Sequence, residues 1–272
     1  MLRIYIVLSV LFSGFAESAT KPQRIASRFI GGDVILLELL KDQSKRIVAL
    51  STLAKDKRYS PVYDKIPSHI KPVGNELESL LKLKPDLVIA ASYTRKEWLN
   101  QLEKVDTPRL ILEDFKSLED ISSNIKKIAE AVGESKRGND LVKQMYRRVQ
   151  SIEQCKISKK KVLNYSPDQV FLGTGTIYDD LLSKKGISNL AKEIGINGWG
   201  KITAEKLATL RPDFVIAAGD SSDYDRKLNE LRSNPMWKRM PAVKNGRLLL
   251  VPSRYLSAVS HHAVEFLELI CR

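Results

Sequence analysis

A segment of fourteen residues occurs twice in this chain, and the two copies align without a gap. The first copy runs from Glu78 to Ala91, and the second begins 127 residues further on and runs from Glu205 to Ala218. Each copy begins with a glutamate, has a proline seven residues later and ends in Val-Ile-Ala-Ala. Because proline stops a helix and favours extended backbone before it, each copy predicts a short helix, a turn and a buried strand. The repeat therefore favours a fold with two similar lobes that present the same helix at the same place.

Short β-branched runs alternate with amphipathic helical patterns along the rest of the chain. This alternation is typical of α/β layers built on largely parallel sheets. The predicted strands are residues 24–27, 46–51, 87–91 and 109–112 in the first half, and 161–165, 214–218 and 247–251 in the second. The predicted fold class is α/β, with two lobes of central, mainly parallel sheets flanked by helices and joined by a single long connector helix.

The connector is predicted from a stretch without any strand pattern, residues 118–154, which is broken only at Gly133 and Gly138. Apolar residues recur there at three- and four-residue spacing, which predicts one long helix over residues 136–154. Such a helix between two small α/β units is a stiff connector. The predicted organisation is a signal peptide at 1–19, an N-terminal α/β lobe at 20–117, a helical connector at 118–158 and a C-terminal α/β lobe at 159–272.

Residues 1–19 have the pattern of a secretory signal peptide. A basic start is followed by the apolar run Ile4–Phe15 and by the small-residue segment Ala16–Ala19. The apolar run is shorter than the roughly 20 residues that span a membrane, which favours cleavage over an uncleaved anchor. No cysteine follows the run. We therefore expect a protein that is exported by a cleaved signal peptide and carries no lipoprotein cysteine; the family resemblance described below implies that it is periplasmic.

Charge and cysteine content narrow the function further. The chain has 45 Lys and Arg against 32 Asp and Glu, a formal net charge of +13, which favours anionic partners. Its two cysteines are too few for a disulfide-dense scaffold or a four-thiolate zinc site. An oxidising compartment would allow Cys155 to pair with Cys271, and two buried free thiols fit the sequence equally well.

Five short motifs, each weak by itself, occur in a fixed order through both lobes. They are Arg46-Ile-Val-Ala-Leu-Ser, Val73-Gly-Asn-Glu-Leu-Glu, Leu83-Lys-Pro-Asp-Leu-Val-Ile-Ala, Asn234-Pro-Met-Trp and Val243-Lys-Asn-Gly-Arg-Leu. With the connector helix, they make the chain resemble the periplasmic substrate-binding proteins of ABC importers for iron complexes and vitamin B12, whose two lobes are joined by one long helix. The resemblance covers most of the chain after residue 19. It implies a monomer that captures a ferric siderophore, haem or cobalamin, delivers it to an inner-membrane permease and performs no chemistry.

The resemblance also implies a role for the repeated glutamates. In that family a glutamate on each lobe docks against arginines of the permease, and the matching positions here are Glu78 and Glu205. Two carboxylates spaced across the lobes of a basic protein would provide an oriented contact that depends on lobe separation. The alternative is that both are ordinary exposed helix glutamates, which contribute little.

The predicted ligand site follows from the strand positions. Ligands of open α/β sheets bind beyond the carboxyl ends of the strands, so the loops there should face a cleft between the lobes. Tyrosine, tryptophan and arginine concentrate in these loops, and the predicted cleft residues are Arg28, Tyr59, Tyr93, Arg95, Thr174, Trp199, Arg254 and Tyr255. Aromatic faces together with guanidinium groups suit a large planar or chelated anionic ligand. This favours a ferric siderophore or haem, with cobalamin as the alternative.

Individual aromatic residues receive different predictions. Trp199 stands between two glycines in what we interpret as a bare loop, where an aromatic side chain is exposed for contact. Trp98 is predicted to pack inside a helix and Trp237 to wedge a helix end. Tyr59 or Tyr93 would be available as an axial phenolate ligand to haem iron, although a tyrosine there more commonly just lines a cleft.

Other chemistry is disfavoured by the sequence. The segment 173–176 lacks the Gly-Lys-Ser/Thr ending of a phosphate-binding loop, so we interpret it as a flexible turn of the cleft. The three histidines, His69, His261 and His262, are too few for a bare metal ion, and adjacent histidines on a helix point about 100° apart. We expect neither a metal site nor a cofactor.

A secreted hydrolase using Ser260 with His261, or Ser257, is a remote alternative because no Gly-x-Ser-x-Gly segment occurs. Nucleic acid is not an expected partner, since the basic run 159–161 is short.

Overall fold

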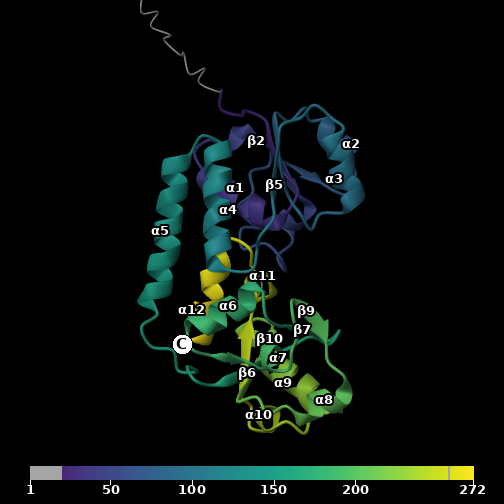
Figure 1. The fold of residues 1–272 in the computed structure, drawn as a ribbon, viewed down its shortest axis with the longest axis vertical. Helices are drawn as coiled ribbons and strands as arrows, with labels where there is room; N and C mark the ends of the chain where they lie inside the picture. Colours follow the sequence, from purple (N-terminus) through teal and green to yellow (C-terminus); the bar gives the residue numbers. More distant parts are fainter. Residues whose placement is uncertain (1–19, 257) are drawn as a thin grey trace, which may run out of the picture.

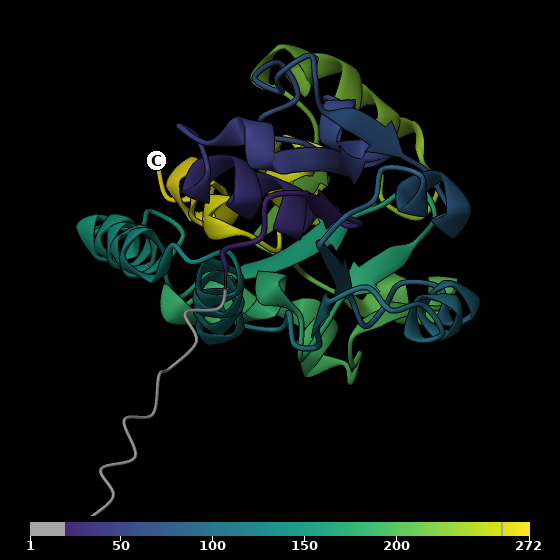
Figure 2. The ribbon, with the colours of Figure 1, turned by 90° about the horizontal axis from the view of Figure 1, so that it is seen from above.

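The computed structural model describes residues 20–256 and 258–272. Two lobes, each built around a β-sheet, are stacked along the long axis of the molecule, with the N-terminal lobe at the top of Figure 1. The helices α4 (Leu118–Ala131) and α5 (Ser135–Ser151) run along one side of the stack, and Figure 2 shows them beside the lobes from above. The signal peptide predicted at 1–19 lies outside the described residues.

The N-terminal lobe contains a five-stranded sheet in which every pair of neighbours is parallel. Its strands in spatial order are β3 (Lys71–Val73), β2 (Ile47–Ser51), β1 (Ile25–Ser27), β4 (Leu87–Ala91) and β5 (Arg109–Leu112). The helices are α1 (Ile30–Leu39), α2 (Leu77–Leu81) and α3 (Lys96–Glu103), with 3₁₀ turns η1 (Ser44–Arg46) and η2 (Thr52–Lys55). Side chains of α1 and α4 pack on one face of the sheet and those of α2 and α3 on the other.

The C-terminal lobe contains a parallel sheet and a small antiparallel one. The parallel sheet has the order β11 (Leu248–Val251), β10 (Phe214–Ala218), β6 (Lys161–Tyr165) and β8 (Ser188–Asn189). The antiparallel pair is β7 (Val170–Leu172) with β9 (Trp199–Lys201). The helices are α6 (Ile177–Lys184), α7 (Leu190–Glu193), α8 (Ala204–Thr209), α9 (Tyr224–Ser233), α10 (Pro241–Lys244), α11 (Ser253–Leu256) and α12 (Val264–Ile270), with 3₁₀ turns η3 (Ser221–Asp223) and η4 (His261–Ala263).

The repeated segment forms the predicted helix, turn and strand in both lobes. The first copy becomes α2 and β4, and the second becomes α8 and β10. The aspartate after each proline has the same function in both. The Asp86 carboxylate accepts hydrogen bonds from the backbone N–H groups of Gln23 and Arg24 at the start of β1, and Asp213 accepts one from Lys161 at the start of β6. The Pro-Asp pair therefore joins the repeated strand to the neighbouring strand of its sheet.

The connector differs in detail from the single helix predicted at residues 136–154. The helix α5 ends earlier, at Ser151, and packs along α4 as an antiparallel hairpin. The chain turns between them at Gly133, which has a φ of +71°. Gly138 lies inside α5 and does not interrupt it. Because glycine has no side chain, α5 packs closely on α4 at this position: a Cβ on Gly138 would lie 2.3 Å from the Cβ of Ala129. The absence of a side chain at Gly138 thus favours the close packing of α4 and α5 as a hairpin.

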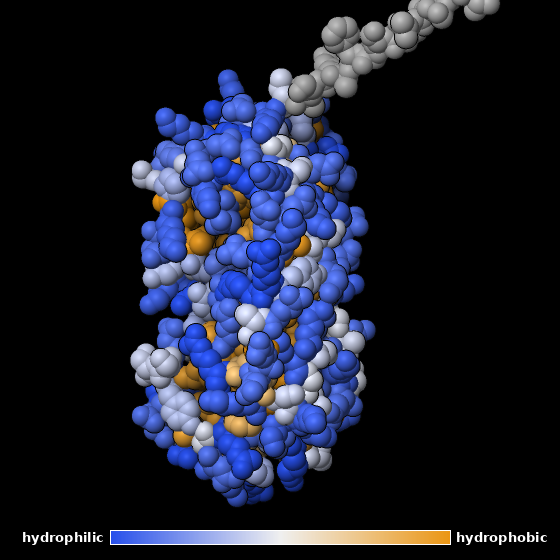
Figure 3. Space-filling view, turned by 90° about the vertical axis from the view of Figure 1, so that its left-hand side faces the viewer, coloured by the Kyte–Doolittle hydropathy of each residue, from blue (hydrophilic) through white to orange (hydrophobic). Residues whose placement is uncertain are grey.

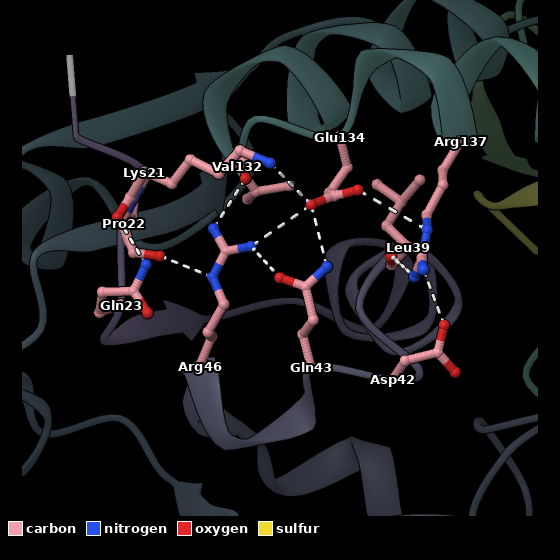
Figure 4. Close-up of polar contacts among 10 residues, drawn as sticks. All are labelled: Lys21, Pro22, Gln23, Leu39, Asp42, Gln43, Arg46, Val132, Glu134 and Arg137. Carbon is pink, nitrogen blue, oxygen red and sulfur yellow. Dashed lines mark hydrogen bonds and ion pairs between the residues drawn. The ribbon is translucent and has the colours of Figure 1, made fainter. Parts of the chain in front are cut away.

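The start of α5 is fixed to the N-terminal lobe by a buried arginine. Arg46 donates hydrogen bonds to the backbone oxygens of Pro22 (2.8 Å) and Val132 (2.7 Å) and to the Gln43 side chain (2.9 Å) (Figure 4). Its Nη1 lies 3.6 Å from Oε1 of Glu134, the residue that precedes α5, and the two side chains are only 7% and 11% exposed. The guanidinium is therefore surrounded by acceptors from three separate segments.

Further contacts extend this network along the first turns of α5 (Figure 4). Glu134 also accepts a hydrogen bond from Lys21 at 3.1 Å. Arg137 donates to the backbone oxygen of Leu39 at 2.9 Å and to the Asp42 carboxylate at 2.7 Å. The α4–α5 turn is thus held by both the N-terminal segment and the end of α1.

The far end of α5 is fixed to the C-terminal lobe by a covalent bond. Cys155, four residues beyond the helix, forms a disulfide with Cys271 at the end of α12. Arg148 adds a bidentate pair with Glu268 at 3.0 and 2.8 Å, and Lys185 donates to the last turn of α5. Of the two alternatives that the sequence allowed for the cysteines, the structure contains the disulfide. Closing a loop of this length is expected to stabilise the protein by about 2–5 kcal/mol.

Most predicted strands are found within one residue of their expected bounds, whereas β3, β7, β8 and β9 were not predicted. Each of these has three residues or fewer, which is too short for an alternating pattern. Trp98 is buried as predicted, and Trp237 is fully buried, where it stacks on Phe171. Within the described ranges, no helix is both long enough and apolar enough to cross a membrane.

The buried network predicts a large difference between two arginines. Arg46→Ala should lower the free energy of unfolding by about 2–4 kcal/mol, because it leaves Glu134 and two backbone carbonyls with fewer partners in a buried setting. Arg58→Ala removes an arginine whose side chain is 73% exposed and should leave the free energy of unfolding nearly unchanged. Urea unfolding followed by circular dichroism measures both. Equal losses for the two variants would contradict a structural role of the network.

Candidate ligand-binding cleft

A cavity of about 490 Å³ lies between the two lobes. The N-terminal lobe contributes the residues that directly follow β4 and β5, and the C-terminal lobe contributes the end of β7, the first turn of α6 and β9. The lining residues are Ile30, Ser92, Tyr93, Glu113, Phe115, Lys116, Leu172, Gly175, Thr176, Ile177, Tyr178, Trp199 and Val259. Most of them are aliphatic or aromatic, as is usual for sites that bind small molecules.

Two of the predicted aromatic residues line this cavity, one from each lobe. Tyr93 is 60% exposed and Trp199 is 65% exposed, which is unusual for such large apolar groups. Tyr93 lies edge to face against Phe115, with ring centroids 5.0 Å apart, and Phe115 in turn contacts Phe29 at 5.6 Å. The Tyr93 ring is thus supported from behind while one face remains available to a ligand.

Trp199 is exposed as predicted but does not lie in a bare loop. It is the first residue of β9 and pairs with Leu172 of β7 in the antiparallel hairpin. The segment 173–176, predicted to be a flexible turn, is also held in place. Gly173 donates a backbone hydrogen bond to Gly198 at 2.9 Å, and Gly198 donates one to Thr174 at 2.8 Å. Both predictions were wrong because the sequence gives no sign of so short a strand pair.

A smaller cavity of about 90 Å³ lies beside the main one and shares Ile30 and Val259 with it. This smaller cavity includes two other predicted residues, Tyr59 and Arg254. The lobes touch where the two cavities meet, since a Cβ on Gly31 would lie only 2.7 Å from the Val259 carbonyl oxygen. The glycine therefore permits the loop before η4 to approach α1 and to divide the cleft.

The remaining predicted residues do not line either cavity. Arg28 donates a hydrogen bond to Asn75 at 2.6 Å and lies over Trp98, while Arg95 is the N-cap residue of α3. Burial lowers the pKa of Arg28. Tyr255 packs beside His262, with ring centroids 6.4 Å apart. Thr174 is exposed and forms a backbone bridge to Asn197. Of the three predicted arginines, only Arg254 therefore lines a cavity, the smaller one, and the main cavity contains the predicted aromatic residues Tyr93 and Trp199 without an arginine.

The cavity also contains residues that the sequence analysis missed. Phe115 follows β5 by three residues and could have been found by the strand-end rule that selected Tyr93. Ile30, Leu172 and Val259 carry no sequence signal of a site, because aliphatic residues at strand and helix ends are ordinary core residues. In the described part of the chain, no group of three or more His, Cys, Asp or Glu could hold a metal ion.

A second hollow lies where both lobes meet α5, a region that we call the joint. It is made of two adjoining cavities of about 210 and 240 Å³ that share Glu38, Val62, Lys65, His261 and His262. His261 is buried, and burial, followed by the nearby charges of His262 and Arg148, lowers its pKa from 6.5 to about 3. The joint therefore contains an imidazole that stays neutral under ordinary conditions.

Figure 3 shows the molecule from the α5 side, where the surface is mostly hydrophilic with separate apolar patches over each lobe.

The sequence matches the family model described as periplasmic binding protein over residues 25–255. The chain belongs to this family. It is similar to an uncharacterised ABC transporter substrate-binding lipoprotein of Bacillus subtilis, with 26% identity over 220 residues, covering 76% of this chain and 68% of the relative. It is also similar to the Fe(3+)-citrate-binding protein of the same organism, with 26% identity over 180 residues and coverage of 63% and 55%. The matched region spans 55% to 68% of the length of four Bacillus relatives.

Solved structures share the fold over nearly the whole chain. A possible iron-binding periplasmic solute-binding protein of Staphylococcus epidermidis superposes with a TM-score of 0.74 at 23% identity, covering 92% of this chain and 97% of that one. The apo haem-binding protein of Roseiflexus superposes with a TM-score of 0.73 at 21% identity, with coverage of 90% and 95%. The predicted α/β fold and the predicted family are confirmed. The family consists of binding proteins of transport systems, which agrees with the prediction that the chain is not an enzyme.

The predicted localisation was wrong in one respect. We expected export by a cleaved signal peptide with no lipoprotein cysteine, and that expectation depended only on residues 1–19 and the cysteine positions. Two Bacillus subtilis relatives, 26% and 28% identical, are named substrate-binding lipoproteins, which indicates lipid anchoring among the relatives and contradicts the exclusion of that route. A periplasmic location in general agrees with the family.

The buried imidazole at the joint predicts a specific pH dependence of stability. The unfolded chain takes up a proton at His261 as the pH falls below about 6.5, whereas the folded protein resists protonation until about pH 3. Stability should therefore fall through this interval, with a contribution of up to about 1.4 kcal/mol per pH unit. His261→Gln should remove this contribution in urea unfolding measured at several pH values between 7 and 4. The matched control His69→Gln, at an exposed histidine, should keep the wild-type profile; indistinguishable slopes for His261→Gln and wild type would refute the assignment.

Proposed function

We propose that this chain is the substrate-binding component of an ABC importer and that it captures an iron complex between its lobes. The first candidate cargo is haem or a ferric complex whose ligand presents a large flat face. The observation that supports this proposal is the pair Tyr93 and Trp199, two exposed aromatic side chains from opposite lobes on one cavity of about 490 Å³. Exposed aromatic surface of this kind is costly unless a ligand covers it.

The character of the lining supports a flat, largely apolar cargo. Among the described residues, the main cavity has one cationic side chain, Lys116, and one carboxylate, Glu113. A porphyrin would place its apolar faces against Tyr93 and Trp199, and its carboxylates would reach Lys116 or, past the close approach of Gly31 to Val259, Arg254. A compact, highly charged ferric chelate would find fewer partners there.

Cobalamin is the second candidate, and the same lining favours it. A corrin ring needs apolar contact area rather than a cluster of cations, and Trp199 supplies a large, rigid face at low entropic cost. Arg28, Arg95, Thr174 and Tyr255 lie outside the cavities, and we propose that they contact cargo only after partial closure of the lobes. The attachments at both ends of α5 favour a small closing motion.

We further propose that Glu78 and Glu205 dock onto the permease. Glu78, in the first turn of α2, has a side chain that is 82% exposed. Glu205 occupies the same position in α8, where hydrogen bonds from its own backbone N–H and from the Thr203 hydroxyl lower its pKa. Each lobe would thus offer one exposed carboxylate, and the distance between them would report lobe separation.

A ligand titration tests the cargo proposal. Purified protein is titrated with haem, a ferric hydroxamate, a ferric catecholate and cobalamin while tryptophan fluorescence and visible absorption are recorded. One class should bind saturably, and Trp199→Ala should weaken its binding about ten- to a hundredfold because a central aromatic contact is lost. The control Trp98→Phe, at a buried tryptophan outside the cavity, should bind normally. Saturable binding that is equal in Trp199→Ala, or no binding of any of the four compounds, would reject the proposal.

A transport assay tests the docking proposal separately. Glu78→Lys combined with Glu205→Lys should abolish uptake of the bound cargo by cells while leaving its affinity in solution unchanged, because neither side chain lines the cavity. Glu97→Lys combined with Asp168→Lys makes the same change in charge at exposed acidic positions and should leave uptake intact. Equal uptake by the two double variants would count against docking through these glutamates.

A further inference from the structure

The end of the C-terminal lobe carries a stretch of exposed basic residues with no acidic residue among them in the sequence. Residues 232–247 run from the last turn of α9 through α10 to the start of β11 and contain five basic residues and no acidic one. All five are exposed: Arg232, Lys238, Arg239, Lys244 and Arg247. We call this set the basic end. Figure 1 shows α10 at the end of the molecule that lies farthest from the N-terminal lobe.

The five side chains are free of ionic partners. Within residues 20–256 and 258–272, none of them forms an ion pair, and only Arg232 donates a hydrogen bond, to the backbone oxygen of Lys244 at 3.1 Å. Glu230, the acidic residue that precedes the set on α9, is already paired with Lys227 and Tyr165. Surface lysines and arginines usually lie among carboxylates, so an unpaired group of five with no acid in the sequence between them suggests an external anion.

Another surface of the protein provides a comparison. The outer side of α4 and α5 also has exposed basic residues, among them Lys126, Lys127, Lys143 and Arg147. The same two helices also carry the exposed acidic residues Glu119, Glu130 and Asp140. The α4–α5 side therefore carries charges of both signs, whereas residues 232–247 include basic residues only.

The backbone beneath the basic end is rigid. Trp237 is fully buried under the 234–240 turn and stacks on Phe171, while Met240 and Val243 pack into the same apolar cluster. The turn is closed by hydrogen bonds from the N–H groups of Trp237 and Lys238 to Asn234. The cations are thus presented by a fixed scaffold and not by a mobile loop, which reduces the ordering cost of binding a surface.

We propose that the basic end binds the headgroups of an anionic phospholipid bilayer. The choice of partner rests on the proposed function, because the binding protein of an importer works beside the membrane that holds the permease. Each lysine or arginine near an anionic bilayer contributes about a fivefold gain in affinity, so five together hold the protein at the surface by charge alone. The contact is separate from the cleft and needs neither cargo nor permease.

Vesicle sedimentation tests this proposal with the purified full chain. The probes are vesicles of equimolar phosphatidylglycerol and phosphatidylcholine, with pure phosphatidylcholine as the neutral comparison. The test variant replaces Lys238, Arg239, Lys244 and Arg247 with glutamine, four residues whose side chains make no hydrogen bond or ion pair in the described structure. The control replaces Lys126, Lys127, Lys143 and Arg147 with glutamine, which removes the same charge from the α4–α5 side. Thermal unfolding verifies that both variants are folded.

Wild type and the control should bind the anionic vesicles. The affinity of the test variant should be lower by at least about a hundredfold. Binding should also decrease steeply with added salt, since salt screens exposed charges. The proposal is overturned if wild type ignores anionic vesicles, if it binds neutral vesicles equally, or if both variants lose affinity to the same extent. If the basic end binds a soluble anionic polysaccharide but the protein does not bind vesicles, the lipid assignment is also overturned. Both variants should bind cargo with wild-type affinity in the ligand titration. A failure of the lipid proposal therefore shows in vesicle binding, whereas a failure of the proposed function shows in cargo binding.

Discussion

The helix α5 is held at its start by the buried Arg46–Glu134 network and near its end by the Cys155–Cys271 disulfide. The first attachment belongs to the N-terminal lobe and the second to the C-terminal lobe, so the separation of the lobes depends on a helix that cannot detach at either end. A guanidinium that is 7% exposed would be unfavourable without its acceptors, and the Pro22 and Val132 carbonyls and Gln43 satisfy it. The apolar core on the α1 side continues through α4 and α5 to α6 and α12, which reinforces this spacing.

The chemistry of the cleft follows from that spacing. Because the lobes are held close, α1 touches the loop before η4 at Gly31 and Val259, and this contact divides the space into a large aromatic cavity and a small one with Tyr59 and Arg254. Phe29 and Phe115 support Tyr93 from one lobe, and the β7–β9 hairpin presents Trp199 from the other. Two large aromatic faces thus remain exposed where an ordinary domain interface would bury them.

The sequence could predict features that repeat or that have a long period. The copies at Glu78 and Glu205 revealed two equivalent lobes, and the structure gives the reason: Asp86 and Asp213 each join their strand to the next one. The hairpin of α4 and α5 was less accessible, since the close packing of Gly138 on Ala129 is a tertiary effect that no local pattern reports. At the site, the strand-end rule found Tyr93 and Trp199. It placed Arg28 and Arg95 in the cleft as well, because sequence position cannot tell whether a residue lines the cavity. Arg28 bonds Asn75 instead, and Arg95 stands at the N-cap position of α3, outside both cavities.

The most direct test is to locate the metal of a bound cargo. Crystals of the complex with haem, or with whichever iron complex binds, would be measured at the iron absorption edge, and the anomalous difference map would be calculated. We expect a single peak between Tyr93 of the N-terminal lobe and Trp199 of the C-terminal lobe. A peak outside this cavity, or on the hollow beside His261, would contradict the assignment of the aromatic cleft as the site where cargo is held.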